Sequence, residues 1–142
     1  MPPAVSRYSP ITPLLALFVA APAVALVPAT ALAADWSKAQ RFAVALVDDA
    51  FKPADLSFHV GKAYRLHLEN KGKETHEFTA PDFFKTLRLR NAKALNADRT
   101  EIVIQPGEQK DLYFVPKQAG RFKLICSDHD WAGMVGDITV AP

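Results

Sequence analysis

Three residues near the C-terminus combine side chains that bind copper. Cys126, His129 and Met134 lie within nine residues, in the spacing Cys-x2-His-x4-Met. Cys126 is the only cysteine of the chain, and Met134 is the only methionine besides Met1. A thiolate, an imidazole and a thioether are soft or borderline ligands, which suit copper better than they suit magnesium or calcium. The sequence therefore predicts a metal site in this segment.

A fourth candidate ligand, His76, lies upstream in residues 75–78, Thr-His-Glu-Phe. Two imidazoles and a thiolate in a trigonal arrangement, with a weak axial methionine, form the ligand set of electron-transfer copper sites. Because side chains alternate between the two faces of a strand, Cys126 and His129 cannot meet on one regular strand. A tight turn after Cys126, with a bend at Gly133, would bring the loop ligands together. The third strong ligand, His76, should then come from a neighbouring strand.

Each candidate ligand has a commoner explanation when it is considered alone. A single cysteine at a strand end is most often a small core residue, and a single histidine is more often solvated than bound to a metal. The joint occurrence of the four side chains at this spacing favours one copper site. His59 and His67 fall on the polar faces of alternating segments, so we expect them to be exposed to solvent and not to bind the metal.

The residues that position this site have the pattern of short β-strands. The run 42–47 is wholly apolar, which is typical of a strand buried on both faces. Residues 56–60 and 64–69 alternate between apolar and polar, and Gly61-Lys62 forms a turn between them. Further strands are predicted at residues 77–81, 101–104, 111–115, 121–126 and 135–140. Short strands separated by turns that contain glycine or proline predict an all-β Greek-key β-sandwich formed by a single domain.

These features together resemble the cupredoxin family, and within it the plastocyanin and pseudoazurin type of copper protein. The resemblance covers nearly the whole of residues 34–142. It rests, besides the ligand loop, on Phe51, Pro53, Leu56, Gly61, Asn70, Gly72, His76, Phe114, Pro116, Gly120 and Phe122. The resemblance implies that one type 1 copper ion is bound by His76, Cys126, His129 and Met134. It also implies that electrons pass through the edge of His129.

Two residues depart from the pattern of that family. Glu77 stands where the family usually has an asparagine whose amide ties the ligand loop in place. The Glu77 carboxylate could accept a hydrogen bond from the Ser127 hydroxyl, bring a negative charge near the metal, or face solvent. Asp128 stands where a proline is common, and with Asp130 it puts a carboxylate on either side of His129. Both departures bear on the spectrum and the reduction potential rather than on copper binding.

Residues 1–33 are predicted to be a secretory signal peptide, and residues 34–142 the copper-binding domain. Arg7 lies in a short N-terminal region, an apolar segment follows over residues 11–27, and Ala31-Leu32-Ala33 provides a cleavage pattern of small residues. Prolines interrupt the apolar segment, which is shorter than the roughly 20 continuous apolar residues of a membrane span. We therefore expect a periplasmic domain without a membrane span. In that oxidising compartment the single cysteine has no internal disulfide partner, and a copper thiolate explains its presence.

The charge of the chain gives no reason to expect a nucleic-acid partner. Lysine and arginine number 17 against 15 aspartates and glutamates, a formal net charge of +2. The stretch from Lys85 to Arg99 is basic, and Asp98 is its sole acidic residue. This stretch is either a solvated face or a docking patch for an acidic redox partner. Residues 85–97 are expected to form a helix or a long loop.

The function predicted from the sequence is that of a monomeric one-electron carrier, whose partner is a redox protein such as a cytochrome or an oxidase. The alternative is a periplasmic copper-binding or resistance protein that sequesters copper or delivers it to an acceptor protein. Tracts rich in methionine or histidine would favour that alternative, and the sequence has none. A copper enzyme is not expected, because four histidines are too few to build a second copper centre as well. A thiolate-bridged pair of coppers would need two cysteines.

Overall fold

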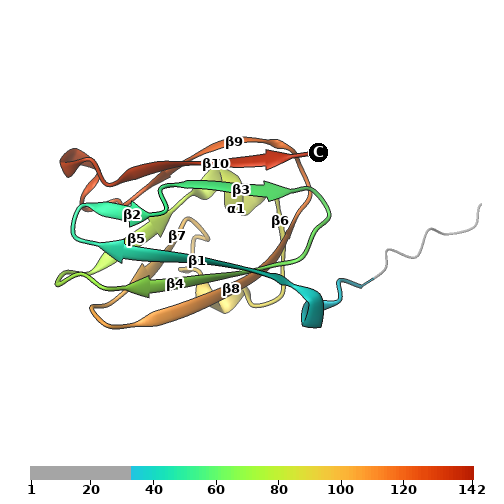
Figure 1. The fold of residues 1–142 in the computed structure, drawn as a ribbon, viewed down its shortest axis with the longest axis horizontal. Helices are drawn as coiled ribbons and strands as arrows, with labels where there is room; N and C mark the ends of the chain where they lie inside the picture. Colours follow the sequence, from blue (N-terminus) through green and yellow to red (C-terminus); the bar gives the residue numbers. More distant parts are fainter. Residues whose placement is uncertain (1–32) are drawn as a thin grey trace, which may run out of the picture. The chain divides into compact units, whose positions relative to one another are not determined.

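The computed structural model describes residues 33–142, which form a sandwich of two five-stranded β-sheets (Figure 1). The first sheet contains, in spatial order, β2 (Ala50–Lys52), β1 (Gln40–Val47), β4 (Tyr64–Asn70), β8 (Gln109–Pro116) and β6 (Leu87–Leu89). The second sheet contains β3 (Asp55–His59), β10 (Val135–Ala141), β9 (Gly120–Ile125), β5 (His76–Thr79) and β7 (Glu101–Ile104). The short helix η1 (Trp36–Lys38) precedes β1, and three further short helices lie between strands: α1 (Pro81–Lys85), η2 (Ala92–Ala94) and η3 (Asp130–Ala132).

The chain crosses between the two sheets several times, so that most paired strands are distant in sequence. β1 pairs with β4 in parallel, and β4 pairs with β8 in antiparallel orientation. In the second sheet β10 lies between β3, to which it is parallel, and β9, to which it is antiparallel. This topology confirms the predicted all-β Greek-key sandwich, and it brings the end of β9 beside β5 through the pair Thr79 and Ile125.

The core fills the space between the sheets with the inward-facing side chains of both. On β4 the inward residues Tyr64, Leu66 and Leu68 are fully buried, while the residues between them are partly exposed. Phe58 of β3 contacts Tyr64, and it also contacts Phe114 edge-on with ring centroids 5.1 Å apart. Aromatic pairs in such geometries add to the free energy gained from burying their area. The two sheets are therefore held together by an aromatic cluster centred on Phe58.

The alternation on β1 differs from the prediction of a strand buried on both faces. Val44 and Leu46 are buried, but Ala43 is exposed and Ala45 is only half-buried. The outer face of the sheet is open to solvent here, as is common for sandwich sheets. The two alanines made residues 42–47 wholly apolar in sequence, which led to the prediction of burial on both faces. Because alanine is small, these residues expose little apolar surface on the solvent side.

The basic stretch also folds differently from the predicted helix or long loop. Phe83 and Phe84 of the one-turn helix α1 are buried, and Leu87 of β6 is buried against the core. β6 then pairs with the end of β8, with Leu89 opposite Phe114. The apolar side chains that interrupt the positive charges are therefore what fixes this segment to the sandwich.

Of the two histidines expected to face solvent, His59 is exposed. His67 is instead mostly covered, with Nδ1 2.9 Å from the carboxylate Oδ1 of Asp111 on the adjacent strand β8. Asp111 also accepts two hydrogen bonds from Arg65. The prediction for His67 was wrong because an outward-facing side chain on a sheet is covered by its cross-strand neighbours.

The predicted signal peptide lies outside the described residues, except for its last residue, Ala33. Among residues 33–142, no helix is long and apolar enough to cross a membrane.

Replacing Phe58 by alanine should lower the free energy of unfolding by about 3–5 kcal/mol, because it leaves a cavity at the centre of the aromatic cluster. Urea denaturation of the metal-free protein measures this loss. Thr139→Ala, an exposed change on β10, is the control and should cost less than about 0.5 kcal/mol. Equal costs for the two variants would contradict the central packing role of Phe58.

Candidate metal centre

The loop between β9 and β10 is closed by main-chain hydrogen bonds among the candidate ligands. Cys126 N donates to Met134 O at 3.0 Å, His129 N donates to Cys126 O at 3.1 Å, and Met134 N donates to His129 O at 3.2 Å. Gly133 ends η3 with a φ of 95°, in the left-handed region that glycine adopts without steric cost. The bend expected at Gly133 is therefore present. It places the fully buried Met134 beside Cys126 at the start of β10.

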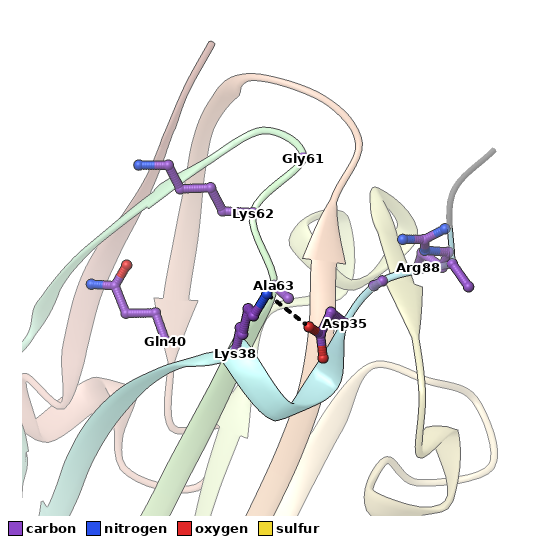
Figure 2. Close-up of a pocket in the computed structure, with 9 residues that line it drawn as sticks. Asp35, Lys38, Gln40, Gly61, Lys62, Ala63 and Arg88 are labelled. Carbon is purple, nitrogen blue, oxygen red and sulfur yellow. Dashed lines mark ion pairs between the residues drawn. The ribbon is translucent and has the colours of Figure 1, made fainter.

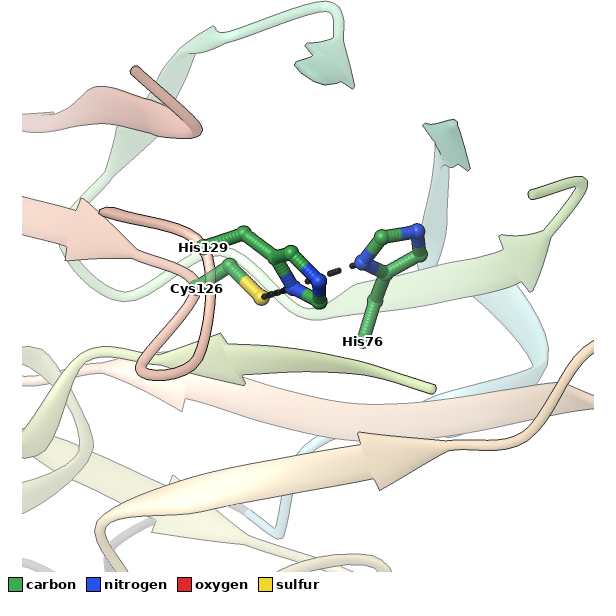
Figure 3. A group of neighbouring side chains, drawn as sticks. All are labelled: His76, Cys126 and His129. Atoms are coloured by element: carbon green, nitrogen blue, oxygen red, sulfur yellow. Dashed lines mark hydrogen bonds between the residues drawn. The ribbon is translucent and has the colours of Figure 1, made fainter. Parts of the chain in front are cut away.

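His76 and His129 present the same nitrogen to the sulfur of Cys126. His76 stands at the start of β5, with Nδ1 3.8 Å from Cys126 Sγ (Figure 3). His129 Nδ1 lies 3.4 Å from the same sulfur. The donor atoms of the three residues all lie within 4.8 Å of one another. The structure therefore brings together one imidazole from strand β5 with a thiol and an imidazole from the loop between β9 and β10.

These distances fit a metal ion. Bond lengths of about 2.0 Å to nitrogen and 2.3 Å to sulfur, at an angle of roughly 110–120°, put two ligands of one metal about 3.5–3.8 Å apart. The separation of 3.8 Å from His76 Nδ1 lies at the upper end of this range, and the separation of 3.4 Å from His129 Nδ1 lies just below its lower end. His76 and Cys126 are buried and His129 is mostly covered. Such a shielded set of soft and borderline donors suits copper.

The outer nitrogen of each histidine faces a carboxylate. His129 Nε2 is 2.7 Å from Glu74 Oε2, a contact that favours a proton on Nε2 and directs Nδ1 at the sulfur. His76 Nε2 is 3.6 Å from Asp48 Oδ1 and is the one buried side-chain nitrogen or oxygen in residues 33–142 without a hydrogen bond. Gly72 lies against the side chains of Asp48 and His76, and a Cβ at position 72 would clash with both of them. Neither carboxylate was identified from sequence, because both come from turns outside the ligand motifs.

Glu77 is buried, so the possibility that it faces solvent is wrong. Its side chain is 5% exposed, and its Oε2 accepts a hydrogen bond from Cys126 Sγ at 3.1 Å. The main-chain N of Glu77 donates to the same sulfur at 3.4 Å. The expected hydrogen bond from Ser127 to Glu77 is absent, since the Ser127 hydroxyl donates to Glu101 Oε2 at 3.1 Å instead. Of the three roles considered for Glu77, the structure supports a negative charge close to the metal ligands.

Burial raises the pKa of the Cys126 thiol to about 11, and the hydrogen bond to the Glu77 carboxylate adds to the rise. The hydrogen bond from the Glu77 main-chain N acts in the opposite direction, because it stabilises the thiolate. The pKa of His129 is raised by its hydrogen bond with Glu74. Both groups must lose a proton before they can bind a metal ion.

The sequence profile of the cupredoxin-like domain matches residues 14–140. The chain belongs to the cupredoxin-like family. The chemistry and the spacing of its donor atoms fit one type 1 copper ion, as the sequence predicted.

The structure is also similar in fold to several solved structures, although no curated protein matches the sequence. Auracyanin B is 23% identical, with a TM-score of 0.55 over 73% of this chain and 90% of that chain. Reduced auracyanin from the photosynthetic bacterium Roseiflexus castenholzii is 20% identical, with a TM-score of 0.56 over 73% of this chain and 98% of that chain. A multicopper oxidase from Campylobacter jejuni, a metallo-oxidase, is 17% identical, with a TM-score of 0.56 over 72% of this chain and 30% of the oxidase. At these identities the likeness concerns the fold.

The apparent affinity for copper should rise with pH. Up to about pH 10 the thiol is protonated in the metal-free protein, because its pKa is about 11, so above the pKa of His129 binding releases one proton and the affinity rises about tenfold per pH unit. Below the raised pKa of His129 a second proton is released and the slope approaches two. Competition with a copper chelator across this range measures the slope. In Cys126→Ser the proton released by the thiol is lost, so the slope should fall by about one throughout this range; an unchanged slope in that variant would contradict thiolate binding.

Replacing Glu77 by glutamine should raise the reduction potential, because a nearby negative charge favours Cu(II) over Cu(I). Glu77 Oε2 lies 3.1 Å from the sulfur, so it would lie within about 5.4 Å of a copper ion bound about 2.3 Å from that sulfur. Coulomb energy at that separation and an effective dielectric near 20 is roughly 3 kcal/mol before screening by solvent. The same variant should lower the thiol pKa of the metal-free protein, because the Glu77 side chain contributes to its rise. Voltammetry and a pH titration of thiolate absorbance measure the two effects.

Glu101→Gln is the matched control, since it removes one carboxylate that contacts Ser127 rather than the Cys126 sulfur. Glu101→Gln should change the reduction potential and the thiol pKa less than Glu77→Gln does. An unchanged potential in Glu77→Gln, or equal shifts in the two variants, would show that the contact with the sulfur has no special influence.

Proposed function

We propose that this protein is an exported one-electron carrier that binds one type 1 copper ion through His76, Cys126, His129 and Met134. The observation that carries the proposal is the convergence of two Nδ1 atoms on one buried sulfur, at 3.4 and 3.8 Å. A carrier requires ligands that keep nearly the same positions in both oxidation states. The loop closed by main-chain hydrogen bonds and the sheet position of His76 supply that rigidity.

Copper, when bound, supplies the one-electron couple, and the residues of the chain hold and shield it. Main-chain N–H groups of Glu77 and Asp128 point at the Cys126 sulfur and stabilise its thiolate. Glu74 holds the imidazole of His129 with Nδ1 toward the sulfur. His129 is the partly exposed member of the set, with 13% of its side chain accessible, so its ring edge is the route to a partner.

The same proposal covers the organisation and the location of the protein. Residues 1–33 would be removed as a signal peptide, and residues 34–142 would act as a monomeric domain in the periplasm. Its partner would be a redox protein such as a cytochrome or an oxidase. An enzymatic role is not proposed, because the three histidine and cysteine donors form one compact group among residues 33–142.

Spectroscopy of two variants tests the ligands. A bond between copper and thiolate gives intense visible absorption, so Cys126→Ser should be colourless when loaded with copper. Met134→Leu should keep the colour and raise the reduction potential, because the axial ligand tunes it. Circular dichroism checks that each variant folds. Intense colour in a folded Cys126→Ser protein would exclude the proposed site.

Rapid mixing separates an electron carrier from a copper-delivery protein. The reduced protein is mixed with an oxidised cytochrome in one experiment and with a metal-free copper acceptor protein in the other. A carrier should reduce the cytochrome quickly and keep its copper in both oxidation states. Slow electron exchange together with rapid loss of copper to the acceptor would favour delivery and overturn the proposal.

A further inference from the structure

The loop that carries the ligands also carries exposed apolar side chains. Trp131 is 82% exposed and Val135 is 47% exposed, and these are the two large exposed hydrophobic residues of the described chain. Both lie between the ligand His129 and the first residues of β10. The indole is fixed in place, because Trp131 Nε1 donates to Asp128 O at 2.9 Å. A rigid, exposed tryptophan is a typical anchor of protein interfaces.

Carboxylates surround this apolar surface. A hollow of about 400 Å³ is lined by Asp48, Asp49, Lys73, Glu74, Asp128, His129 and Trp131. Four of these side chains are acidic and one is basic, although basic residues outnumber acidic ones in the chain as a whole. Asp130 in η3 is exposed next to Trp131 and adds a further negative charge. The concentration of acid around His129 is therefore local to this end of the molecule.

The other end of the sandwich is basic. A hollow of about 390 Å³ there is lined by three basic side chains, Lys38, Lys62 and Arg88, and by one acidic side chain, Asp35, which forms an ion pair with Lys38 (Figure 2). It adjoins the Tyr64 end of β4, whereas the Asn70 end of the same strand bonds to Glu74 O beside the metal centre. The seven residues of β4 span roughly 20 Å. Arg88, on β6 within the basic stretch, is therefore separated from His129 by about the length of the sheet.

We propose that the surface formed by Trp131, Val135 and the surrounding Asp48, Asp49, Glu74, Asp128 and Asp130 docks a redox protein whose own surface is positively charged around its cofactor edge. This inference rests on the proposed function and names the class of its partner. Trp131 supplies the apolar contact, and the carboxylates orient and attract the partner. One electron passes from the reduced protein to the oxidised partner at His129, and no atom is exchanged. An acidic partner docked at Arg88 would lie about 20 Å from this route.

The test uses a lysine-rich c-type cytochrome as the probe, together with the same cytochrome after its lysines have been acetylated, which removes their charge. The variant Asp49→Asn, Asp128→Asn, Asp130→Asn removes three charges and leaves Glu74 and Asp48, which face the histidines, intact. Asparagine suits position 49, where φ is 64°. The control variant Asp35→Asn, Asp82→Asn, Asp98→Asn removes three exposed charges outside the acidic hollow.

At low ionic strength, electron transfer from the reduced protein to the lysine-rich cytochrome should be about tenfold slower in the first variant and almost unchanged in the control. Transfer by the native protein should slow with added salt and be slow with the acetylated cytochrome. Equal rates with the two cytochromes, or equal slowing in the two variants, would overturn the inference. Faster transfer to the acetylated form would favour the basic stretch and overturn it as well.

Binding by the metal-free protein separates this inference from the proposed function. The indole N–H signal of Trp131 in an NMR titration should shift on addition of the lysine-rich cytochrome, and Trp131→Ala should weaken the complex several-fold, with the Trp36 signal as an internal reference. A shift at Trp131 without electron transfer by the copper-loaded protein would support the docking surface and contradict the carrier function. Rapid electron transfer with an unshifted Trp131 signal would support the carrier function and contradict the docking surface.

Discussion

The hydrogen bond from Cys126 N to Met134 O closes the loop between β9 and β10, and the geometry of the metal centre depends on it. It pairs the residue after β9 with the residue before β10, so that the antiparallel pairing of those strands continues to the candidate ligands themselves. The pairing of β9 with β10 in the sandwich therefore fixes the conformation of this short loop. The strand β5 completes the group, because its pairing beside β9 sets His76 Nδ1 opposite the sulfur.

Charge is distributed around the centre in two layers. Glu77 is buried against the Cys126 sulfur, whereas Glu74 and Asp48 face the outer nitrogens of the two histidines. A carboxylate next to a ligand sulfur disfavours the additional electron density of the reduced state, and a carboxylate on an outer imidazole nitrogen fixes the ring. The acidic surface beyond them extends the same negative field toward any partner that approaches His129. The residues that face the ligands and those of the proposed docking surface are therefore adjacent at one end of the sandwich.

Much of the fold could be predicted because the strands have one apolar and one polar face. The alternation of Leu56 and Phe58 with their polar neighbours identified β3. The predicted strand at residues 101–104 has the same bounds as β7 in the structure. The short strand β6 was not predicted, since three residues carry too little periodicity to distinguish a strand from a helix. The half-buried state of His67 was missed because it depends on Asp111, which is distant in sequence.

The sequence by itself determined the candidate ligands and the family, because the spacing of Cys126, His129 and Met134 is a local property of one loop. It also placed Asp128 and Asp130 beside His129, since they are neighbours in that loop. Only the tertiary structure decided that the Glu77 carboxylate turns inward to the sulfur while Ser127 bonds to Glu101. The same holds for Asp48 and Glu74, which come from two separate turns and meet the histidines only after β1 and β4 have paired. Such contacts depend on the pairing register of strands that are far apart in the chain, and no local pattern of residues encodes that register.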